Sequence, residues 1–180
     1  MNPSAHSSLK KVAVIGPECT GKSVLSAFLA DHFHTEWVRE HAREFIEGLN
    51  RPYNETDLLT IAKGQLKLED DAAKRANGML FCDTNLVVIK VWSEFKYGRT
   101  NPEILKLMEH RHYDLYLLTN IDIPWAEDPQ REHPHSREEL YSMYLQEMES
   151  QSVPFVEVKG AGDERTQNAL RSVERMLSIV

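Results

Sequence analysis

The segment Gly16–Ser23 carries the pattern G-x-x-x-x-G-K-S and stands between a short apolar run and a helical pattern. Its two glycines let consecutive backbone N–H groups face phosphate oxygens, and the helix that follows adds its positive N-terminal end. Lys22 is expected to reach the outer phosphates and the Ser23 hydroxyl to ligate Mg²⁺. The sequence therefore predicts a nucleoside triphosphate site, formed by Gly16, Pro17, Glu18, Cys19, Thr20, Gly21, Lys22, Ser23 and Val24.

Length and charge limit what surrounds this loop. The 180 residues suit one domain with a sizeable core, expected at 10–180 after a flexible N-terminus at 1–9. The net charge of −7 and the absence of a basic stripe argue against a nucleic-acid partner. No apolar run approaches the roughly 18 residues of a membrane span, and two cysteines suit a reducing compartment. We therefore expect a cytoplasmic protein without a membrane partner.

Apolar strand patterns alternate with helical patterns along the chain. This alternation is typical of a parallel sheet with helices on both faces. We expect an α/β fold of the P-loop NTPase type with about five strands. The strands are predicted at 11–15, 36–38, 79–82, 115–119 and 155–158, and the helices at 21–33, 42–49, 56–76, 85–97, 102–110, 137–150 and 164–179.

Asp83 follows the apolar run that begins at Met79. In P-loop enzymes a carboxylate at such a strand end holds Mg²⁺ beside the loop serine, or serves as a base. An alternative is that Asp83 or Thr84 caps the next helix. Because parallel strands place ligands at their carboxyl ends, we expect Gly16, Glu40 and Asp83 to meet in one crevice, which favours the metal or base role.

A charged segment at 39–44 follows the second predicted strand. A carboxylate there can bind sugar hydroxyls or take a proton from an attacking hydroxyl, and an arginine can hold phosphate charge. A solvated helix start would have the same composition. The position at a strand's carboxyl end favours Glu40 and Arg43 as substrate-binding residues.

The segment 124–134 is polar and interrupted by prolines, and with the predicted helix at 137–150 it is expected to form a lid. Lid arginines neutralise charge on a transferred phosphoryl group, and closure excludes water. Arg131 is the first candidate for this role and Arg137 the second. The alternative is a plain surface loop.

The three tryptophans are aromatic faces with different expected surroundings. Trp125, in the predicted lid, offers a stacking surface for a base, although loop packing is an alternative. Trp37 and Trp92 are expected to belong to the core, although all three tryptophans are available to contact an aromatic ring of the substrate.

Taken together, these motifs resemble a known family. The segments GPECTGKS (16–23), WVREHARE (37–44), FCDTN (81–85), VWSE (91–94) and DIPWAEDPQR (122–131) are similar in order and spacing to the ribosylnicotinamide kinase domain of NadR-type proteins. The resemblance implies ATP-dependent phosphorylation of the 5′-hydroxyl of nicotinamide riboside to nicotinamide mononucleotide. It covers the chain from about Lys10 onward and implies Mg²⁺ as the cofactor.

The resemblance also assigns residues. It implies ATP at 16–23, Mg²⁺ or the base at Asp83, and a lid at Trp125, Asp128 and Arg131. Family loops commonly carry Ser or Thr at the position of Cys19, and a tyrosine at that of His41. The resulting predictions are Lys22, Asp83, Arg131 and Glu40 as catalytic residues, Glu40, Arg43, Trp125 and Asp128 as substrate-binding residues, and Ser23 and Asp83 as metal ligands.

NadR-type proteins join this domain to an adenylyltransferase and sometimes to a DNA-binding module. Neither would fit before Lys10, so the expectation is a stand-alone kinase. Two alternatives keep the phosphate loop and change the reaction. One is a kinase for another nucleoside or small alcohol. The other is a nucleotide-dependent switch that acts on a protein partner, which would hydrolyse ATP without any acceptor.

Overall fold

A five-stranded, all-parallel sheet forms the centre of the molecule. The computed structural model describes residues 9–178, and its strand order is β2-β3-β1-β4-β5. This confirms the predicted α/β class and parallel sheet. The strands are β1 (Lys10–Ile15), β2 (Glu36–Val38), β3 (Met79–Asp83), β4 (Leu115–Thr119) and β5 (Phe155–Val158).

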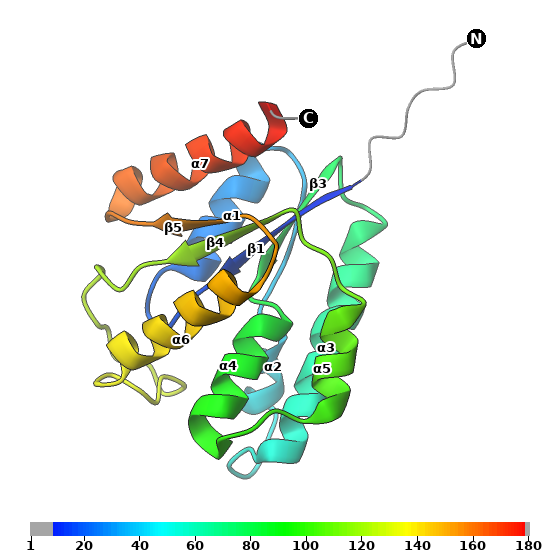
Figure 1. Ribbon diagram of the computed structural model, residues 1–180, viewed down its shortest axis with the longest axis vertical. Coiled ribbons are helices and arrows are strands. Elements are labelled where there is room, and N and C mark those ends of the chain that lie inside the picture. The colour runs from blue at the N-terminus through cyan, green and yellow to red at the C-terminus, as the bar shows by residue number, and fades with distance from the viewer. Residues whose placement is uncertain (1–8, 179–180) are drawn as a thin grey trace.

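Helices cover both faces of this sheet. In Figure 1, α1 and α7 lie on one side of the sheet, and α6 lies on the other. The group α2 to α5, called here the helical lobe, gathers below the sheet in the same view and has a hydrophobic cluster of its own. The helices are α1 (Lys22–His32), α2 (His41–Glu47), α3 (Glu55–Ala73), α4 (Leu86–Tyr97), α5 (Pro102–Glu109), α6 (Arg137–Ser150) and α7 (Gly162–Ser178).

The central strand β1 is buried on both faces. Val12 and Val14 pack with residues of α1 and α7, whereas Ala13 and Ile15 pack with residues of α3, α4 and α6. All four side chains have no exposed surface. A strand covered on both faces carries a continuous apolar run rather than an alternating one, which is the pattern seen here.

Some element ends differ from the sequence prediction. Helix α3 begins one residue earlier than predicted, because the Asn54 side chain accepts the Thr56 and Asp57 N–H groups, and the Asp57 carboxylate accepts the Asn54 N–H. The same helix ends at Ala73, three residues before the predicted end. The predicted N-terminal segment 1–9, apart from Leu9, and Ile179 of the last predicted helix lie outside the described residues.

Strand register brings the predicted site segments to one edge of the sheet. Val14 of β1 is opposite Asp83 of β3, and Ile15 is opposite Leu118 of β4. Val38, at the end of β2, pairs with Cys82. The phosphate loop, Asp83 and the charged segment after β2 therefore leave the sheet side by side.

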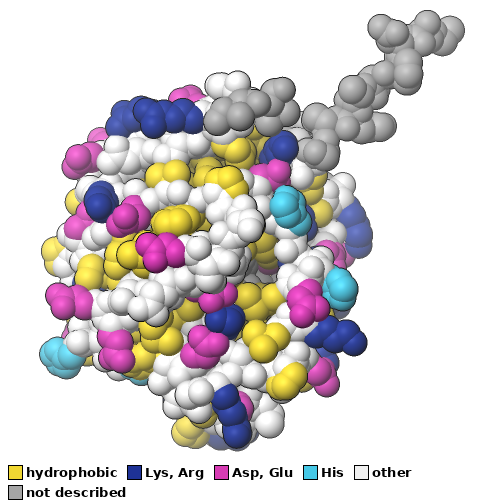
Figure 2. All heavy atoms as spheres, viewed as in Figure 1, with side chains coloured by type: hydrophobic (Ala, Val, Ile, Leu, Met, Phe, Trp, Pro, Cys, Tyr) yellow, Lys and Arg dark blue, Asp and Glu magenta, His cyan; other side chains and the backbone are white. Residues whose placement is uncertain are grey.

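One face of the described surface has mixed charge (Figure 2). On the face shown in Figure 2, Lys and Arg side chains are interspersed with Asp and Glu rather than gathered in a stripe. Within residues 9–178, no helix has both the length and the apolar composition that crossing a membrane requires.

Candidate active site

The phosphate loop is anchored from behind by β4. Gly16 has φ of 137°, and a Cβ there would lie 2.4 Å from Thr119 Oγ1, so the position requires glycine. The Thr119 hydroxyl donates to the Ile15 carbonyl at 2.9 Å and lies 2.7 Å from the Thr20 hydroxyl. Thr20 in turn donates to the Pro17 carbonyl at 2.8 Å. These buried contacts hold the loop in its curve before any ligand is bound.

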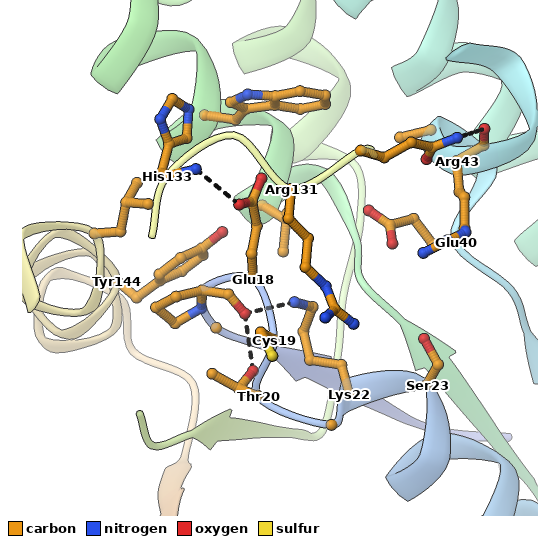
Figure 3. Close-up of a pocket in the computed structure, with 18 of the residues that line it drawn as sticks. Glu18, Cys19, Thr20, Lys22, Ser23, Glu40, Arg43, Arg131, His133 and Tyr144 are labelled. Carbon is orange, nitrogen blue, oxygen red and sulfur yellow. Dashed lines mark hydrogen bonds between the residues drawn. The ribbon is translucent and has the colours of Figure 1, made fainter. Parts of the chain in front are cut away.

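Lys22 begins α1 directly after Gly21, whose φ is 79°. Its ammonium donates to the Pro17 carbonyl at 2.8 Å, which folds the side chain over the loop. Figure 3 shows the Lys22 and Arg131 side chains both projecting over the loop. Two cations thus face the space that the sequence assigns to phosphates.

Asp83 is buried at the end of β3, with 1% of its surface exposed. The alternative that it caps the next helix does not hold, because the Asn85 side chain accepts the Val87 N–H at 3.0 Å and caps α4. Burial raises the pKa of Asp83 to about 6, while the Ser23 hydroxyl and the Lys22 ammonium act in the opposite direction.

The Asp83 carboxylate also suits a cation. Its Oδ1 is buried and has no hydrogen-bond partner among residues 9–178. Such an oxygen calls for a donor or a metal. Mg²⁺ is commonly bound by one or two carboxylates together with phosphates and waters, so Ser23 and Asp83 fit this ion.

A cavity of about 210 Å³ opens beside the phosphate loop (Figure 3). Residues of the loop, of α2, α4 and α6 and of the chain before α6 surround it. Of the residues predicted from the sequence, all of 16–24, Glu40, Arg43 and Arg131 line it. The other lining residues are Ala42, Ile46, Val88, Trp92, Gln130, His133, Leu140 and Tyr144.

Glu40 is available to this cavity because its side chain forms no hydrogen bond or ion pair with another residue in the range 9–178. It is the N-cap residue of α2, yet its side chain makes no cap hydrogen bond. The next residue, His41, donates its N–H to Gln65 Oε1 at 2.8 Å and packs on Gly64 of α3. A Cβ at Gly64 would lie 2.1 Å from His41 Nε2, so this glycine sets how closely α2 approaches α3.

Two predicted substrate residues stand apart from the cavity lining. Asp128 does not line the cavity, but it contacts two residues that do: its Oδ2 accepts a hydrogen bond from Arg43 Nη2 at 2.7 Å, and its Oδ1 accepts one from the Gln130 N–H at 3.0 Å. Trp125 has the guanidinium groups of Arg131 and Arg137 each 6.0 Å from its ring centroid. The Trp125 ring thus lies between Arg131 and the first residue of α6 rather than in the cavity lining.

The segment 120–136, called here the lid segment, lies against the phosphate loop. The backbone N–H groups of Glu132 and His133 both donate to Glu18 Oε2, at 3.0 and 3.2 Å. The Ala126 N–H donates to Cys19 Sγ at 3.2 Å, and Arg137 Nη2 donates to the Cys19 carbonyl at 3.2 Å. The lid segment is therefore closed over the loop.

The structure settles which tryptophan reaches the cavity. Trp92 packs in the hydrophobic cluster of the helical lobe, as expected, and it also lines the cavity, whereas Trp37 packs against the core. Val88 and Trp92 are four residues apart on α4, and Leu140 and Tyr144 are four apart on α6. Residues at this spacing share a helix face, and that spacing is the signal that would have found the apolar wall.

The fold and the site together are those of a P-loop kinase of small molecules. The chain belongs to the AAA domain family, whose pattern matches residues 11–165.

Known relatives narrow this class. The chain is 29% identical over 159 residues to the "Trifunctional NAD biosynthesis/regulator protein NadR" of Escherichia coli K12, which covers 84% of this chain and 38% of the relative. The Salmonella typhimurium LT2 protein of the same name is 28% identical over 176 residues. That match covers 94% of this chain and 43% of the relative. The chain thus spans about two fifths of these curated relatives.

Solved structures agree on the fold. A NadR protein in complex with NR superposes with a TM-score of 0.77 at 21% identity, over 93% of this chain and 50% of that one. A thymidylate kinase from Ehrlichia chaffeensis superposes with a TM-score of 0.64 at 11% identity. The match covers 93% of this chain and 98% of the thymidylate kinase. The chain is a NadR-like kinase domain, which confirms the family resemblance.

Proposed function

We propose that this chain transfers the γ-phosphoryl group of MgATP to the 5′-hydroxyl of nicotinamide riboside, giving nicotinamide mononucleotide and ADP. The observation that carries the proposal is a single cavity lined both by the phosphate loop and by Glu40 with an apolar, aromatic wall. NR and AMP-PNP are bound by NadR proteins of the same fold, which supports a ribosyl acceptor and an ATP donor.

At the acceptor end, the proposal gives a role to each side of the cavity. Glu40, which no cap hydrogen bond occupies, would bind ribose hydroxyls. Trp92 and Tyr144 would pack against the aromatic ring of the acceptor, since aromatic side chains stack with rings at low entropic cost. Arg43 would sit at the rim, oriented by its hydrogen bond to Asp128.

At the donor end, the residues handle charge. Lys22 and Arg131 would stabilise the phosphoryl oxygens, where charge is spread in the transition state. Ser23 and Asp83 would hold Mg²⁺, which screens the phosphates when it is bound. The acceptor oxygen forms the new P–O bond as the bond to the β-phosphate oxygen breaks, and the hydroxyl proton passes to Glu40 or Asp83.

Closure of the lid segment supports transfer over hydrolysis. Its contacts with Glu18 and Cys19 cover the loop, and a covered site keeps water from competing with the acceptor hydroxyl. This closure favours phosphoryl transfer over the nucleotide-dependent switch, which needs no acceptor. The cytoplasmic location expected from the sequence stays a prediction.

The test is phosphoryl transfer from ATP to nicotinamide riboside, run beside a panel of ordinary nucleosides, with the product identified by mass. Conversion of nicotinamide riboside in preference to the panel would establish both reaction and substrate. Transfer to another nucleoside would keep the kinase and replace the acceptor. ATP hydrolysis with no phosphorylated product would contradict the proposal and favour a switch.

A further inference from the structure

Glu132 is held by the phosphate loop through the protein backbone. Its N–H and that of His133 donate to the same oxygen of Glu18, at 3.0 and 3.2 Å. Because both donors are backbone amides, these contacts fix the path of the chain itself. Hydrogen bonds to an ionised carboxylate are stronger than those between neutral groups, and here one carboxylate oxygen accepts two of them.

The side chain of Glu132 reaches the helical lobe. Its Oε2 accepts hydrogen bonds from the Tyr53 hydroxyl at 2.9 Å and from Lys96 Nζ at 3.2 Å. The Lys96 ammonium also lies 3.7 Å from the centre of the Tyr53 ring. Burial and the Glu132 carboxylate raise the pKa of Tyr53, so its hydroxyl stays a donor. One residue thus links the lid segment to two separate parts of the molecule.

We propose that Glu132 is a positioning residue that fastens the lid segment to the loop through Glu18 and to the helical lobe through Tyr53 and Lys96. We call these four residues the Glu132 clasp. Arg131 directly precedes Glu132 and projects over the loop (Figure 3). With its neighbour held from both sides, Arg131 keeps the position from which it meets the phosphoryl group. This inference rests on the proposed function, which gives Arg131 that role.

The exposure of the clasp suits a contact that opens and closes. The side chains of Lys96 and Glu132 are 31% and 38% exposed, and ion pairs at that exposure are individually weak. A lid has to release between turnovers to admit ATP and acceptor and to free the products. Separate contacts of Asp128 and Gln130 with Arg43 also tie the lid segment to α2, so the clasp has to be tested against them.

The catalytic test compares Glu132→Ala with Glu132→Gln. The alanine variant keeps the backbone donors but loses the lobe contacts, and kcat is expected to fall about tenfold with a small change in KM for ATP. The fraction of ATP that is hydrolysed rather than transferred should rise. The glutamine variant keeps an accepting oxygen and should recover most of kcat. An unchanged kcat in the alanine variant, or an equal loss in both variants, would overturn the clasp.

A second test does not depend on catalysis. Lys96→Met removes the ammonium and leaves the lid segment's own sequence unchanged, so intrinsic amide exchange rates there stay the same. Hydrogen exchange of the peptide 126–136 should be faster in this variant than in the wild-type protein. Lys106→Met, at an exposed lysine of α5, is the matched control. Unaltered exchange after Lys96→Met would contradict the clasp, whether or not the wild-type protein phosphorylates an acceptor. If exchange is faster in Lys96→Met but the wild-type protein phosphorylates no acceptor, the clasp stands and only the proposed function is refuted.

Discussion

The phosphate loop and the lid segment face each other, yet they are held by different kinds of interaction. The loop depends on glycine geometry and on buried hydroxyl contacts with β4. The lid segment depends on partly exposed hydrogen bonds with three other elements of the chain. The difference is functional, because phosphate binding needs a preorganised surface and substrate exchange needs a contact that can break. Variants on the two sides should therefore fail in different ways.

Replacing Lys22 by Ala should have the largest effect. The variant removes the ammonium over the loop and is expected to lower kcat/KM by about 10³-fold, because the phosphoryl charge loses a partly buried cationic partner. The fold should remain, since Lys22 makes its hydrogen bond to a loop carbonyl rather than to the core. Transfer rates and the far-UV circular dichroism of the variant measure both. Lys67→Ala, an exposed lysine of α3, is the control, and retained kinase activity in Lys22→Ala would refute the loop assignment.

Replacing Arg131 by Ala tests the lid side. We expect kcat to fall by about 10²-fold and ATP affinity to change much less, because the lid arginine acts on charge that develops during transfer. Steady-state kinetics together with calorimetric titration of ATP separate the two quantities. Arg175→Ala, an exposed arginine on α7, serves as the control. An effect confined to ATP binding would contradict the lid role.

A smaller effect is expected where the lid segment meets α2. Arg43 is flanked by two carboxylates, Asp128 at 2.7 Å and Glu47 at 3.6 Å. Only Asp128 belongs to the lid segment, so Asp128→Ala should raise KM for the acceptor about threefold, as expected for one partly exposed pair. Glu47→Ala keeps the lid contact and should leave KM unchanged. Equal effects of the two variants would show that only the charge near Arg43 matters.

A buried carboxylate in helix α3, outside the phosphate loop and the lid segment, tests the stability of the fold rather than catalysis. Glu69 on α3 is fully buried, and burial raises its pKa to about 7, against the opposing effect of the Tyr113 hydroxyl. Since the folded pKa lies above the ordinary value of 4.5, this group stabilises the fold below about pH 4.5, and that contribution is lost as the pH rises through 7.

The stability of the Glu69→Gln variant relative to the wild-type protein should therefore increase as the pH rises. The unfolding free energy of the variant minus that of the wild-type protein should increase by up to about 3 kcal/mol between pH 4.5 and 8. Urea denaturation at a series of pH values measures it. A difference that does not change with pH would show that burial does not raise the pKa of Glu69 in the native protein. Activity at a fixed pH should be unaffected.

The sequence predicted the loop and the sheet because both rest on local rules. The pattern that contains Gly16, Gly21 and Lys22 adopts the phosphate-loop conformation when it follows a buried strand. Apolar runs between helical patterns imply a parallel sheet. The role of Asn85 as the cap of α4 was missed because Asp, Thr and Asn are all good cap residues. Three neighbouring candidates cannot be ranked without the backbone geometry.

The lid segment and the apolar wall were harder to predict for another reason. Contacts such as Glu18 with Glu132, or Tyr53 with Glu132, join residues that are 114 and 79 positions apart and follow no periodic pattern. Trp92 looked like a core residue because it is one in part, with its ring shared between the helical lobe and the cavity. Such a double role depends on how two helices pack and is not visible in either helix alone.

The hydrogen bond between Thr119 and Ile15 has a consequence for how the protein is made. These residues are 104 positions apart, and the segment between them contains the whole helical lobe. On the ribosome, the phosphate loop emerges early but has no backing until β4 has been synthesised. Nascent chains that end before Thr119 would leave one edge of β1 open, and an open apolar strand edge invites association with other chains. Nucleotide can thus favour the folded chain only late in translation.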